Sequence, residues 1–278
     1  MNHSGKADVE LNLTEGEKIY FASDFHLGLP TRLTPLARER IVVEWLQTIE
    51  ADAKAVFFVG DIFDFWYEWK YAVPKGYIRF FGQLARMTDK GIQLHFFTGN
   101  HDIWLFTYLQ EALGAHVYRN AIHLSVNGVP IYVAHGDGLG PGDFGFKLLK
   151  KLFTNKTAQW AFGWLHPTLA LWFGYSWSRK RRYSQVKKEF LGEKEWLIIH
   201  SREILSHSYF KYLVYGHRHI PVEYPLNQQS VYINLGDWIS GFTFGTFCET
   251  QFHLTQFKNL PDVIEDGKKV TNASTKHK

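Results

Sequence analysis

The stretch Phe57-Phe58-Val59-Gly60-Asp61-Ile62-Phe63-Asp64 decides how the rest of this chain is interpreted. It is an apolar run that ends abruptly on an aspartate, a pattern typical of a strand that is buried on both faces of a sheet. The glycine lets the backbone turn sharply and come close to the group that Asp61 holds. Asp61 is therefore our candidate for the bridging ligand of a two-metal site.

Four other stretches repeat this design, in which an apolar strand ends in side chains that bind metals. They are Asp24-Phe25-His26, Gly99-Asn100-His101-Asp102, His135-Gly136-Asp137 and Gly216-His217-Arg218-His219. Alone, an Asp at the end of a strand is more often a cap or a turn residue than a ligand. Because five such stretches occur in one chain, together they predict a metal site.

The composition limits the class of protein. The chain has 278 residues, of which 45% are hydrophobic, so it can form one large domain or one domain with a substantial insertion. It is neither a disordered nor a fibrous protein. The single cysteine, Cys248, excludes an intrachain disulfide framework and a cysteine-rich zinc module, which favours a reducing compartment, with the cytoplasm as the default.

The sequence offers no signal for export or for spanning a membrane. Residues 1–18 are polar and lack the apolar core of a secretory signal. No stretch of about 18 or more residues is uninterruptedly apolar. We therefore expect neither a cleaved N-terminal peptide nor a transmembrane helix.

The charge is distributed unevenly along the chain. Residues 140–192 contain ten Lys and Arg against two acidic residues, a net charge of +8, so the remainder carries −4 of the total of +4. A basic segment of this kind indicates an anionic partner, such as a phosphorylated substrate, an acidic membrane surface or nucleic acid. The aromatic residues stand beside the charges rather than alternating with them, which suits a membrane surface better than nucleic acid.

The first half of the chain alternates expected strands and helices. Strands are expected over residues 18–23, 55–60 and 92–98, and helices over residues 34–52, 74–90 and 103–113. Thr34 would cap the first helix and Gly91 would end the second. The Asn127-Gly128 pair predicts a hairpin between residues 121–126 and 129–134, and further strands are expected over 212–215, 231–235 and 242–248. Alternation that gives way to hairpins predicts a layered α/β domain with a mixed sheet.

A glycine-rich break at residues 138–142 predicts a hinge into an inserted subdomain. We therefore divide the chain into a core of residues 1–139 and 193–261, a basic and aromatic helical lid of residues 140–192, and a polar tail of residues 262–278. The lid would begin with a basic amphipathic helix, whose apolar residues share one face. That face holds Phe144, Leu148, Leu149, Leu152 and Phe153, and the lysines displayed away from it are Lys147, Lys150 and Lys151.

The spacing of the motifs suits a metal centre. Residues two apart in a strand point to the same side, so Asp24 and His26 can reach one metal, as can His217 and His219. Open α/β sheets bind ligands beyond the carboxyl ends of their strands, where all five motifs lie. Carboxylate, amide and imidazole ligands favour Mn²⁺, Fe or Zn²⁺ over Ca²⁺. The set indicates a dinuclear centre with ions about 3.5–4 Å apart, able to activate a water and stabilise an in-line displacement.

In this order, Asp-x-His, Gly-Asp, Gly-Asn-His-Asp, a His before Gly, and Gly-His-x-His resemble the calcineurin-like metallophosphoesterases over residues 24–219. The resemblance implies a layered β-sandwich of mixed sheets flanked by helices, with two divalent ions, Mn²⁺ first among the candidates. It implies one ion on Asp24, His26, Asp61 and His219, and another on Asp61, Asn100, His135 and His217. By the same resemblance, His101 would assist the phosphoryl oxygen or the leaving group, and Asp102 would orient it.

A finer resemblance concerns the substrate. Residues 23–27, residues 60–66, His135-Gly136-Asp137 and the basic helical insertion after it are similar to the UDP-2,3-diacylglucosamine pyrophosphatases of lipid A synthesis. That family implies a hydrolase at the inner face of the bacterial cytoplasmic membrane, which cleaves a lipid-linked UDP-sugar to UMP and 2,3-diacylglucosamine 1-phosphate. The chain departs from well-known members in one position, because His101 stands where they carry Arg.

The lid independently fits an acylated and phosphorylated substrate. Aromatic residues over 160–177, Trp160 and Trp164 among them, could line an acyl chamber, and Arg179, Arg181 and Arg182 could meet the pyrophosphate or lipid headgroups. The aromatic residues could equally be ordinary lid core, and the arginines a solvated basic face. Asp64, Asp137 and Asp237 are either partners of ligating histidines or turn residues.

Two other functions stay open at this point. A broader metallophosphodiesterase could act on nucleotides or other phospholipids, and His101 keeps that alternative in place. The fold can also serve as a metal-free scaffold for protein partners, but a scaffold would normally lack some of the ligands, and this chain has the full set.

Overall fold

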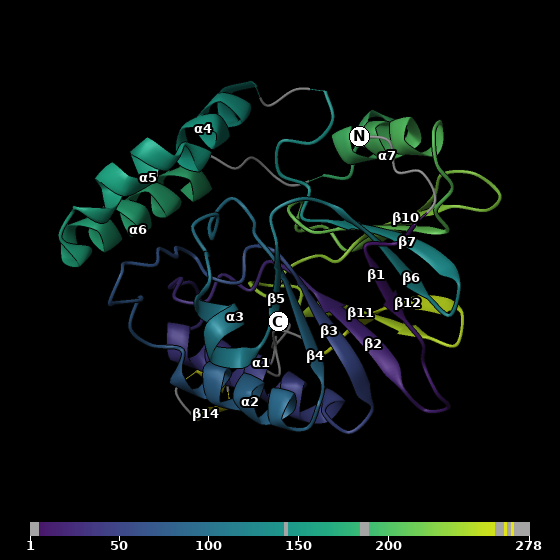
Figure 1. The fold of residues 1–278 in the computed structure, drawn as a ribbon, viewed down its shortest axis with the longest axis horizontal. Coiled ribbons are helices and arrows are strands. Elements are labelled where there is room, and N and C mark those ends of the chain that lie inside the picture. Colours follow the sequence, from purple (N-terminus) through teal and green to yellow (C-terminus); the bar gives the residue numbers. More distant parts are fainter. Residues whose placement is uncertain (1–5, 142–143, 184–188, 259–263, 266–267, 270–278) are drawn as a thin grey trace, which may run out of the picture.

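The computed structural model describes residues 6–141, 144–183, 189–258, 264–265 and 268–269, and within these ranges the side chains of residues 144–146, 177, 179–183, 264–265 and 268–269 are not described. Two six-stranded sheets stack face to face, and helices cover the outer face of each (Figure 1). The two mixed sheets flanked by helices confirm the predicted fold class.

One sheet has the strand order β12-β11-β2-β3-β4-β5. Its strands are β2 (Lys18–Ala22), β3 (Ala53–Val59), β4 (Gln93–Phe97), β5 (His116–Tyr118), β11 (Thr243–Cys248) and β12 (Gln251–Gln256). Strands β2 to β5 run parallel, and β11 joins them antiparallel to β2. The carboxyl ends of three adjacent strands, β2, β3 and β4, consequently lie at one edge of this sheet.

The other sheet has the order β1-β6-β7-β8-β10-β9. Its strands are β1 (Val9–Leu11), β6 (Ile122–Val126), β7 (Val129–Ala134), β8 (Tyr212–Tyr215), β9 (Val222–Pro225) and β10 (Val231–Asn234). Strands β7, β8 and β10 run parallel. Asn127 and Gly128 form the turn between β6 and β7 with φ of 49° and 78°, which confirms the predicted hairpin.

Helices α1 (Pro35–Ile49), α2 (Ile78–Asp89) and α3 (Tyr108–Leu113) cover the outer face of the first sheet, and α7 (Trp196–Leu205), preceded by the short η1 (Gly192–Lys194), covers that of the second (Figure 1). Between β7 and α7 come α4 (Phe144–Thr154), α5 (Lys156–Gly163) and α6 (Pro167–Tyr183), which we call the inserted helices. They form a separate group beyond the strands. The short strands β13 (Ile264–Glu265) and β14 (Lys268–Lys269) pair within the segment expected to be a polar tail.

From Ala55 to Val59, strand β3 is apolar at every position. Phe57 packs between the two sheets and stacks on Phe21 at 5.0 Å between ring centroids, whereas Phe58 faces the helices and stacks on Phe96 at 4.4 Å. Successive side chains of a strand point to opposite faces, so a strand covered on both sides needs apolar residues at every position. The expectation of a doubly buried strand is confirmed, since Ala55 to Val59 are all fully buried.

Two helix boundaries differ from expectation. Thr34 caps α1 by accepting a hydrogen bond from the Ala37 amide, as expected, but α2 begins four residues later than the predicted residue 74. The Glu39 carboxylate of α1 accepts the amides of Arg79 and Phe80 at 2.9 and 3.1 Å and so fixes where α2 starts. Helix α3 begins at Tyr108 rather than at residue 103 because Ile103 and Trp104 pack against the inserted helices instead.

No described helix is both long enough and apolar enough to cross a lipid bilayer.

Truncation of Phe58 tests the layer between the first sheet and its helices. Phe58 is fully buried and also meets Phe25 and Phe80 edge to face. We expect Phe58→Ala to lower the free energy of unfolding by about 3–5 kcal/mol, since it opens a cavity in a packed core. Urea denaturation measures this, with Tyr71→Ala as the control, because Tyr71 is 89% exposed. A change as small for Phe58→Ala as for the control would contradict this packing.

Candidate metal centre

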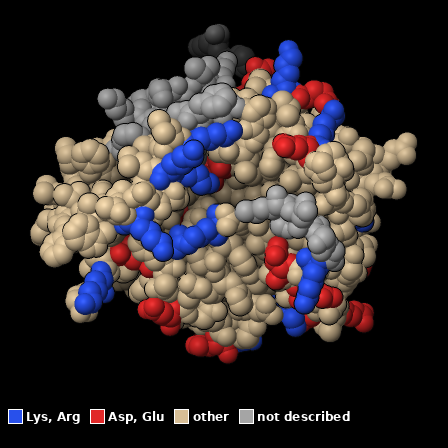
Figure 2. Space-filling view, turned by 45° about the horizontal axis from the view of Figure 1, so that its top comes forward, with Lys and Arg blue, Asp and Glu red and all other residues tan. Residues whose placement is uncertain are grey.

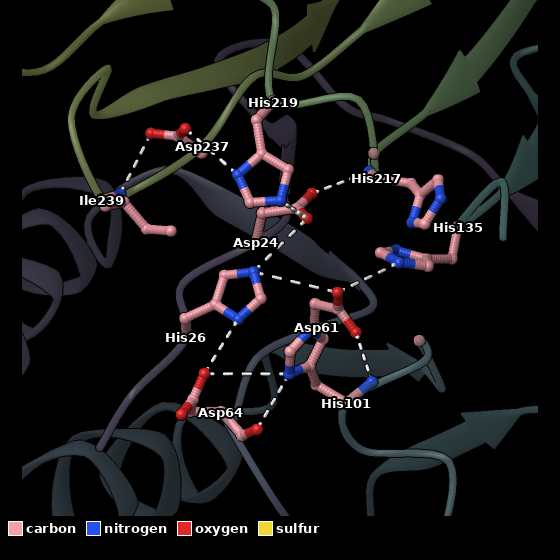
Figure 3. A network of polar contacts seen from close by, with 12 residues as sticks. Asp24, His26, Asp61, Asp64, His101, His135, His217, His219, Asp237 and Ile239 are labelled. Atoms are coloured by element: carbon pink, nitrogen blue, oxygen red, sulfur yellow. Dashed lines mark hydrogen bonds and ion pairs between the residues drawn. The ribbon is translucent and has the colours of Figure 1, made fainter. Parts of the chain in front are cut away.

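Six strands from the two sheets deliver polar side chains to one place. Asp24 and His26 follow β2, Asp61 follows β3, and Asn100 and His101 follow β4, whereas His135 follows β7 and His217 and His219 follow β8. The sixth strand, β10, is followed by Asp237. The loops meet across the aligned edges of the two sheets, so that residues about 190 positions apart come into contact (Figure 3). The predicted placement of the five motifs beyond the carboxyl ends of strands is confirmed.

The geometry within each motif differs from the expectation of side chains that alternate along a strand. Strand β2 ends at Ala22 and β8 at Tyr215, so these motifs lie in the loops beyond. Five of the residues adopt left-handed backbone conformations, which cost non-glycine residues on the order of 1–3 kcal/mol each. They are Asp24 (φ 56°), His26 (45°), Asp61 (53°), His217 (67°) and His219 (55°). Tight backbone turns, and not strand pleating, therefore aim these side chains.

Glycines allow the loops to come this close. A Cβ added to Gly99 would lie 2.6 Å from the Asp61 backbone nitrogen, and one added to Gly216 would lie 2.7 Å from Oδ2 of Asp24. Any side chain at these positions would push the loops apart. The Gly-Asn-His-Asp and Gly-His-x-His motifs thus need glycine for space.

Among the residues that the structure describes, three overlapping groups of side chains could hold metal ions. In each, the ligand atoms lie within 4.8 Å of one another, and the groups are Asp24, His26 and His219; His26, Asp61 and His101; and Asp61, His135 and His217. Asp24 Oδ1 lies 3.0 Å from His219 Nε2, and Asp61 Oδ2 lies 3.4 Å from His135 Nε2 and 3.8 Å from His26 Nε2. Asp61 belongs to the second and third groups, and His26 belongs to the first and second.

Protein oxygens hold the second ring nitrogen of several histidines. His135 donates from Nδ1 to the Val59 carbonyl at 2.8 Å, and His219 donates from Nδ1 to Asp237 Oδ2 at 3.1 Å (Figure 3). In both rings Nε2 is consequently the nitrogen turned toward the carboxylates. This arrangement fixes the tautomer of a metal-ligating imidazole and raises its basicity.

His101 is held by Asp64, not by Asp102 as predicted. His101 Nδ1 lies 2.9 Å from the Asp64 carbonyl, to which it donates, and 3.7 Å from Oδ1 of the same residue. The Asp102 carboxylate instead accepts the backbone amides of Gly99 and Ile62, each at 2.7 Å, with two weaker contacts to the amides of Asp61 and Phe63. Asp102 thus shapes the loop that carries Asp61.

Opposite charges within this cluster offset the free-energy cost of burying its ionised side chains. Burial disfavours a charged His135, yet the Asp61 carboxylate raises the pKa of that imidazole to about 10. Burial likewise disfavours an ionised Asp61, but His135 and His101 hold its pKa below the usual value. Burial and the charge of His135 lower the pKa of His217 to about 3. The cluster therefore keeps ionised carboxylates and needs positive charge beside them, which protons or metal cations can supply.

The donor set fits divalent metal ions. The buried Oδ1 of Asn100 and Nε2 of His135 make no hydrogen bond, a costly state that a metal ligand would relieve. The available donors are carboxylate oxygens, one amide oxygen and imidazole nitrogens, which suit transition-metal ions and Zn²⁺. The residues expected from the sequence thus stand where they could bind two ions.

The substrate contacts expected in the lid do not lie at the candidate metal centre in the described part of the chain. Trp160 and Trp164 are 65% and 76% exposed and lie against each other at 5.9 Å between ring centroids. The other face of the same helix, with Ala158 and Phe162, lines the cavity next to the centre. The side chains of Arg179, Arg181 and Arg182 lie outside the described residues.

Residues outside the predicted ligand set also contact the loops that carry the candidate ligands. The fully buried Arg38 of α1 donates from Nη1 to the carbonyls of His26 and Leu29, at 3.1 and 2.9 Å. No sequence signal marks it. Asp237, expected to be either a partner of a ligating histidine or a turn residue, makes both contacts: its Oδ2 accepts from His219 at 3.1 Å, and its Oδ1 accepts the Ser240 amide at 2.8 Å. Asp137 bonds to Lys150 of α4 at 2.6 Å rather than to a histidine.

A family model described as calcineurin-like phosphoesterase matches residues 17–221. A UDP-2,3-diacylglucosamine hydrolase from Porphyromonas gingivalis is 35% identical over 87% of this chain and 98% of its own. A protein of the same name from Nitrosococcus oceani is 26% identical over 87% of this chain and 95% of its own. Among solved structures, a dimetal phosphatase from Danio rerio has a TM-score of 0.45 and 12% identity, covering 86% of this chain and 95% of that one.

Metal analysis tests the role of Asp61 as the shared ligand. After purification in Mn²⁺ and removal of free metal, we expect about two ions per chain, and fewer than one in Asp61→Asn, because the two expected ion sites share the Asp61 carboxylate. Elemental mass spectrometry measures the content. Asp89→Asn is the control, since Asp89 is exposed at the end of α2. A folded Asp61→Asn that retains both ions would show that Asp61 does not bridge them.

Proposed function

This chain belongs to the calcineurin-like phosphoesterase family, and we propose that it hydrolyses the pyrophosphate of UDP-2,3-diacylglucosamine to UMP and 2,3-diacylglucosamine 1-phosphate. In this proposal residues 1–139 and 193–261 form the catalytic domain, and residues 140–192 form a lid over it. The relatives that carry this substrate in their names cover most of both chains.

The observation that carries the proposal is a cavity of about 350 Å³ beside the metal centre. Asp64, Asn100 and His101 form its polar end. The rest of the wall is almost entirely apolar, and comes from both the catalytic domain and the inserted helices. It consists of Phe65, Ile103, Trp104, Leu149, Leu152, Phe153, Ala158, Phe162, Phe173, Gly174 and Ser178. An apolar chamber that opens on candidate metal ligands suits a molecule with a phosphate at one end and acyl chains at the other.

In this proposal seven residues would hold two metal ions. One ion would be held by Asp24, His26, Asp61 and His219, and the other by Asp61, Asn100, His135 and His217, with Mn²⁺ preferred and Fe or Zn²⁺ as alternatives. When bound, such a pair of ions activates a water and stabilises the oxygens of an in-line displacement.

His101 stands at the polar end of the cavity. Because its Nδ1 donates to the Asp64 carbonyl, Nε2 is the nitrogen left to meet a phosphoryl oxygen or the leaving group. Burial lowers the pKa of this imidazole, so Nε2 would carry no proton at neutral pH and would have to take one up before it could donate to a phosphoryl oxygen or to the leaving group.

The surface around the site suits an anionic and lipid-bound substrate. Lys and Arg side chains stand around a hollow on the face shown in Figure 2. The inserted helices and their connections carry more than half of the exposed large apolar side chains among the described residues. These are Leu148, Leu152, Trp160, Trp164, Leu165, Leu169, Trp172 and Phe173. Exposed aromatic residues near lysines are typical of proteins that lie on anionic bilayers. We therefore propose peripheral binding at the inner face of the cytoplasmic membrane.

A second candidate is a broader metallophosphodiesterase that acts on nucleotides or other phospholipids. The observation that favours it is His101, which stands where the resembled pyrophosphatases carry Arg. The two candidates differ in whether turnover requires acyl chains.

Release of UMP tests chemistry and substrate together. With Mn²⁺ and UDP-2,3-diacylglucosamine, we expect robust release from the native protein and below about 1% of that rate from Asp61→Ala, because the metal pair is lost. The deacylated UDP-glucosamine should be hydrolysed more than about tenfold more slowly, since it leaves the apolar cavity unfilled. Equal rates on both would favour the broader phosphodiesterase. Metal-dependent cleavage of an aryl phosphodiester without UMP release would overturn the lipid assignment.

Vesicle binding tests the proposed membrane contact. We expect the double variant Trp160→Ser/Trp164→Ser to bind vesicles of phosphatidylethanolamine and phosphatidylglycerol about tenfold more weakly, because two exposed aromatic rings are removed. Cosedimentation measures the bound fraction. Tyr71→Ser is the matched control, an exposed aromatic residue outside the inserted helices. Equal binding by the native protein and the double variant would exclude this surface.

A further inference from the structure

Helix α6 of the insertion reaches the metal centre itself. Ser178 donates from its hydroxyl to Oδ1 of Asp64 at 2.8 Å, across 114 residues of sequence. Both side chains are buried, each with 2% of its surface exposed. An inserted helix thus makes a buried, charge-assisted hydrogen bond to a residue of the catalytic loops, a contact that is stronger than one between neutral groups.

The packing of the same helix face holds this contact in place. Gly174 precedes Ser178 by one helical turn, so the two residues lie on one face of α6. A Cβ at Gly174 would overlap the ring of Phe65, the residue next to Asp64. The helix therefore lies as close to this loop as a helix backbone can, with Gly174 over Phe65 and Ser178 over Asp64.

One oxygen of Asp64 accepts a hydrogen bond and also lies close to two imidazoles. Oδ1, which accepts from Ser178, also lies 3.5 Å from His26 Nδ1 and 3.7 Å from His101 Nδ1. Figure 3 shows Asp64 below both imidazoles, with His26 extending from it toward Asp24 and Asp61. The position of this oxygen therefore influences the orientation of a candidate metal ligand and of the residue next to the substrate cavity.

Not every buried helical serine bonds to a charged group. Ser201, buried in α7, donates to the Leu197 carbonyl of its own helix at 2.6 Å and lies 3.1 Å from the neutral hydroxyl of Tyr215. Ser178 reaches out of α6 to a carboxylate in the catalytic loops.

We propose that Ser178 is a positioning residue of the metal centre, which acts through Asp64 on His26 and His101. The inserted helices are then part of the frame of the catalytic site, and their effect extends to substrates without acyl chains. The inference rests on the phosphoesterase chemistry proposed above, but it does not depend on the lipid substrate.

Titration of the metal-stripped protein with Mn²⁺, followed by electron paramagnetic resonance, tests the inference without substrate. We expect Ser178→Ala to weaken Mn²⁺ binding about fivefold, the effect of one net hydrogen bond, and Asp64→Asn to weaken it about 10–100-fold. Ser176→Ala, two residues away on the same helix, should bind as the native protein does. In the Asp64→Asn background, Ser178→Ala should have a smaller effect, because the neutral amide oxygen accepts a weaker hydrogen bond than the carboxylate does.

Turnover of bis(p-nitrophenyl) phosphate supplies the second readout. We expect Ser178→Ala to lower kcat with KM unchanged, since a change in the position of Asp64 alters the metal centre and not the binding of the diester. Native Mn²⁺ affinity in Ser178→Ala, an equal loss in Ser176→Ala, or an undiminished effect in the Asp64→Asn background would each overturn the inference. Because Mn²⁺ binding is measured without substrate, inactivity toward the diacylated substrate would refute the proposed function and leave this inference standing.

Discussion

The structure depends on the burial of charged groups where the two sheets meet. Asp24 and Asp61 are almost completely buried, and a carboxylate removed from water is costly unless cations or hydrogen bonds surround it. Imidazoles and backbone amides supply that surrounding here. Asp61 Oδ1 accepts the His101 amide at 2.8 Å, and Asp24 Oδ2 accepts the His217 amide at 2.9 Å. The second of these bonds crosses from one sheet to the other, so the charge cluster also fixes how the sheets are aligned.

Much of the fold and of the candidate site could be predicted from the sequence, because each motif is a short continuous stretch of the chain. An apolar run followed at once by Gly-Asp or Asp-x-His indicates both a buried strand and the end at which its ligands lie. The five motifs therefore predicted the fold class, and they contain the residues that the structure brings together beyond the strand ends. The backbone conformation could not be predicted in the same way, because the left-handed φ of Asp61 results from contacts with Gly99 and Asp102, which lie about 40 residues further along the chain.

The interactions that the sequence did not reveal are those between distant side chains. Asp102 has the spacing expected of a partner for His101, yet the structure uses it to bind the amides of the Asp61 loop, and places Asp64 against His101 instead. Arg38 and Ser178 belong to helices with no motif, and only the packed structure shows their partners. Periodicity identifies the face of a helix, but it does not show which neighbour will cover that face.

The inserted helices illustrate this point, because they have two apolar faces rather than one. In α4, Leu149 and Phe153 line the cavity while Leu148 is 72% exposed, and Lys150 turns back to Asp137 instead of pointing to solvent. A helix packed only as a lid would leave its outer face polar, whereas a helix that also meets a bilayer needs apolar residues on both sides. Two of these helices, α6 and α4, also bond to Asp64 and Asp137, one residue from each of two catalytic loops. In the proposed function, the segment that meets the lipid surface is therefore tied by hydrogen bonds to the loops that hold the metal ligands.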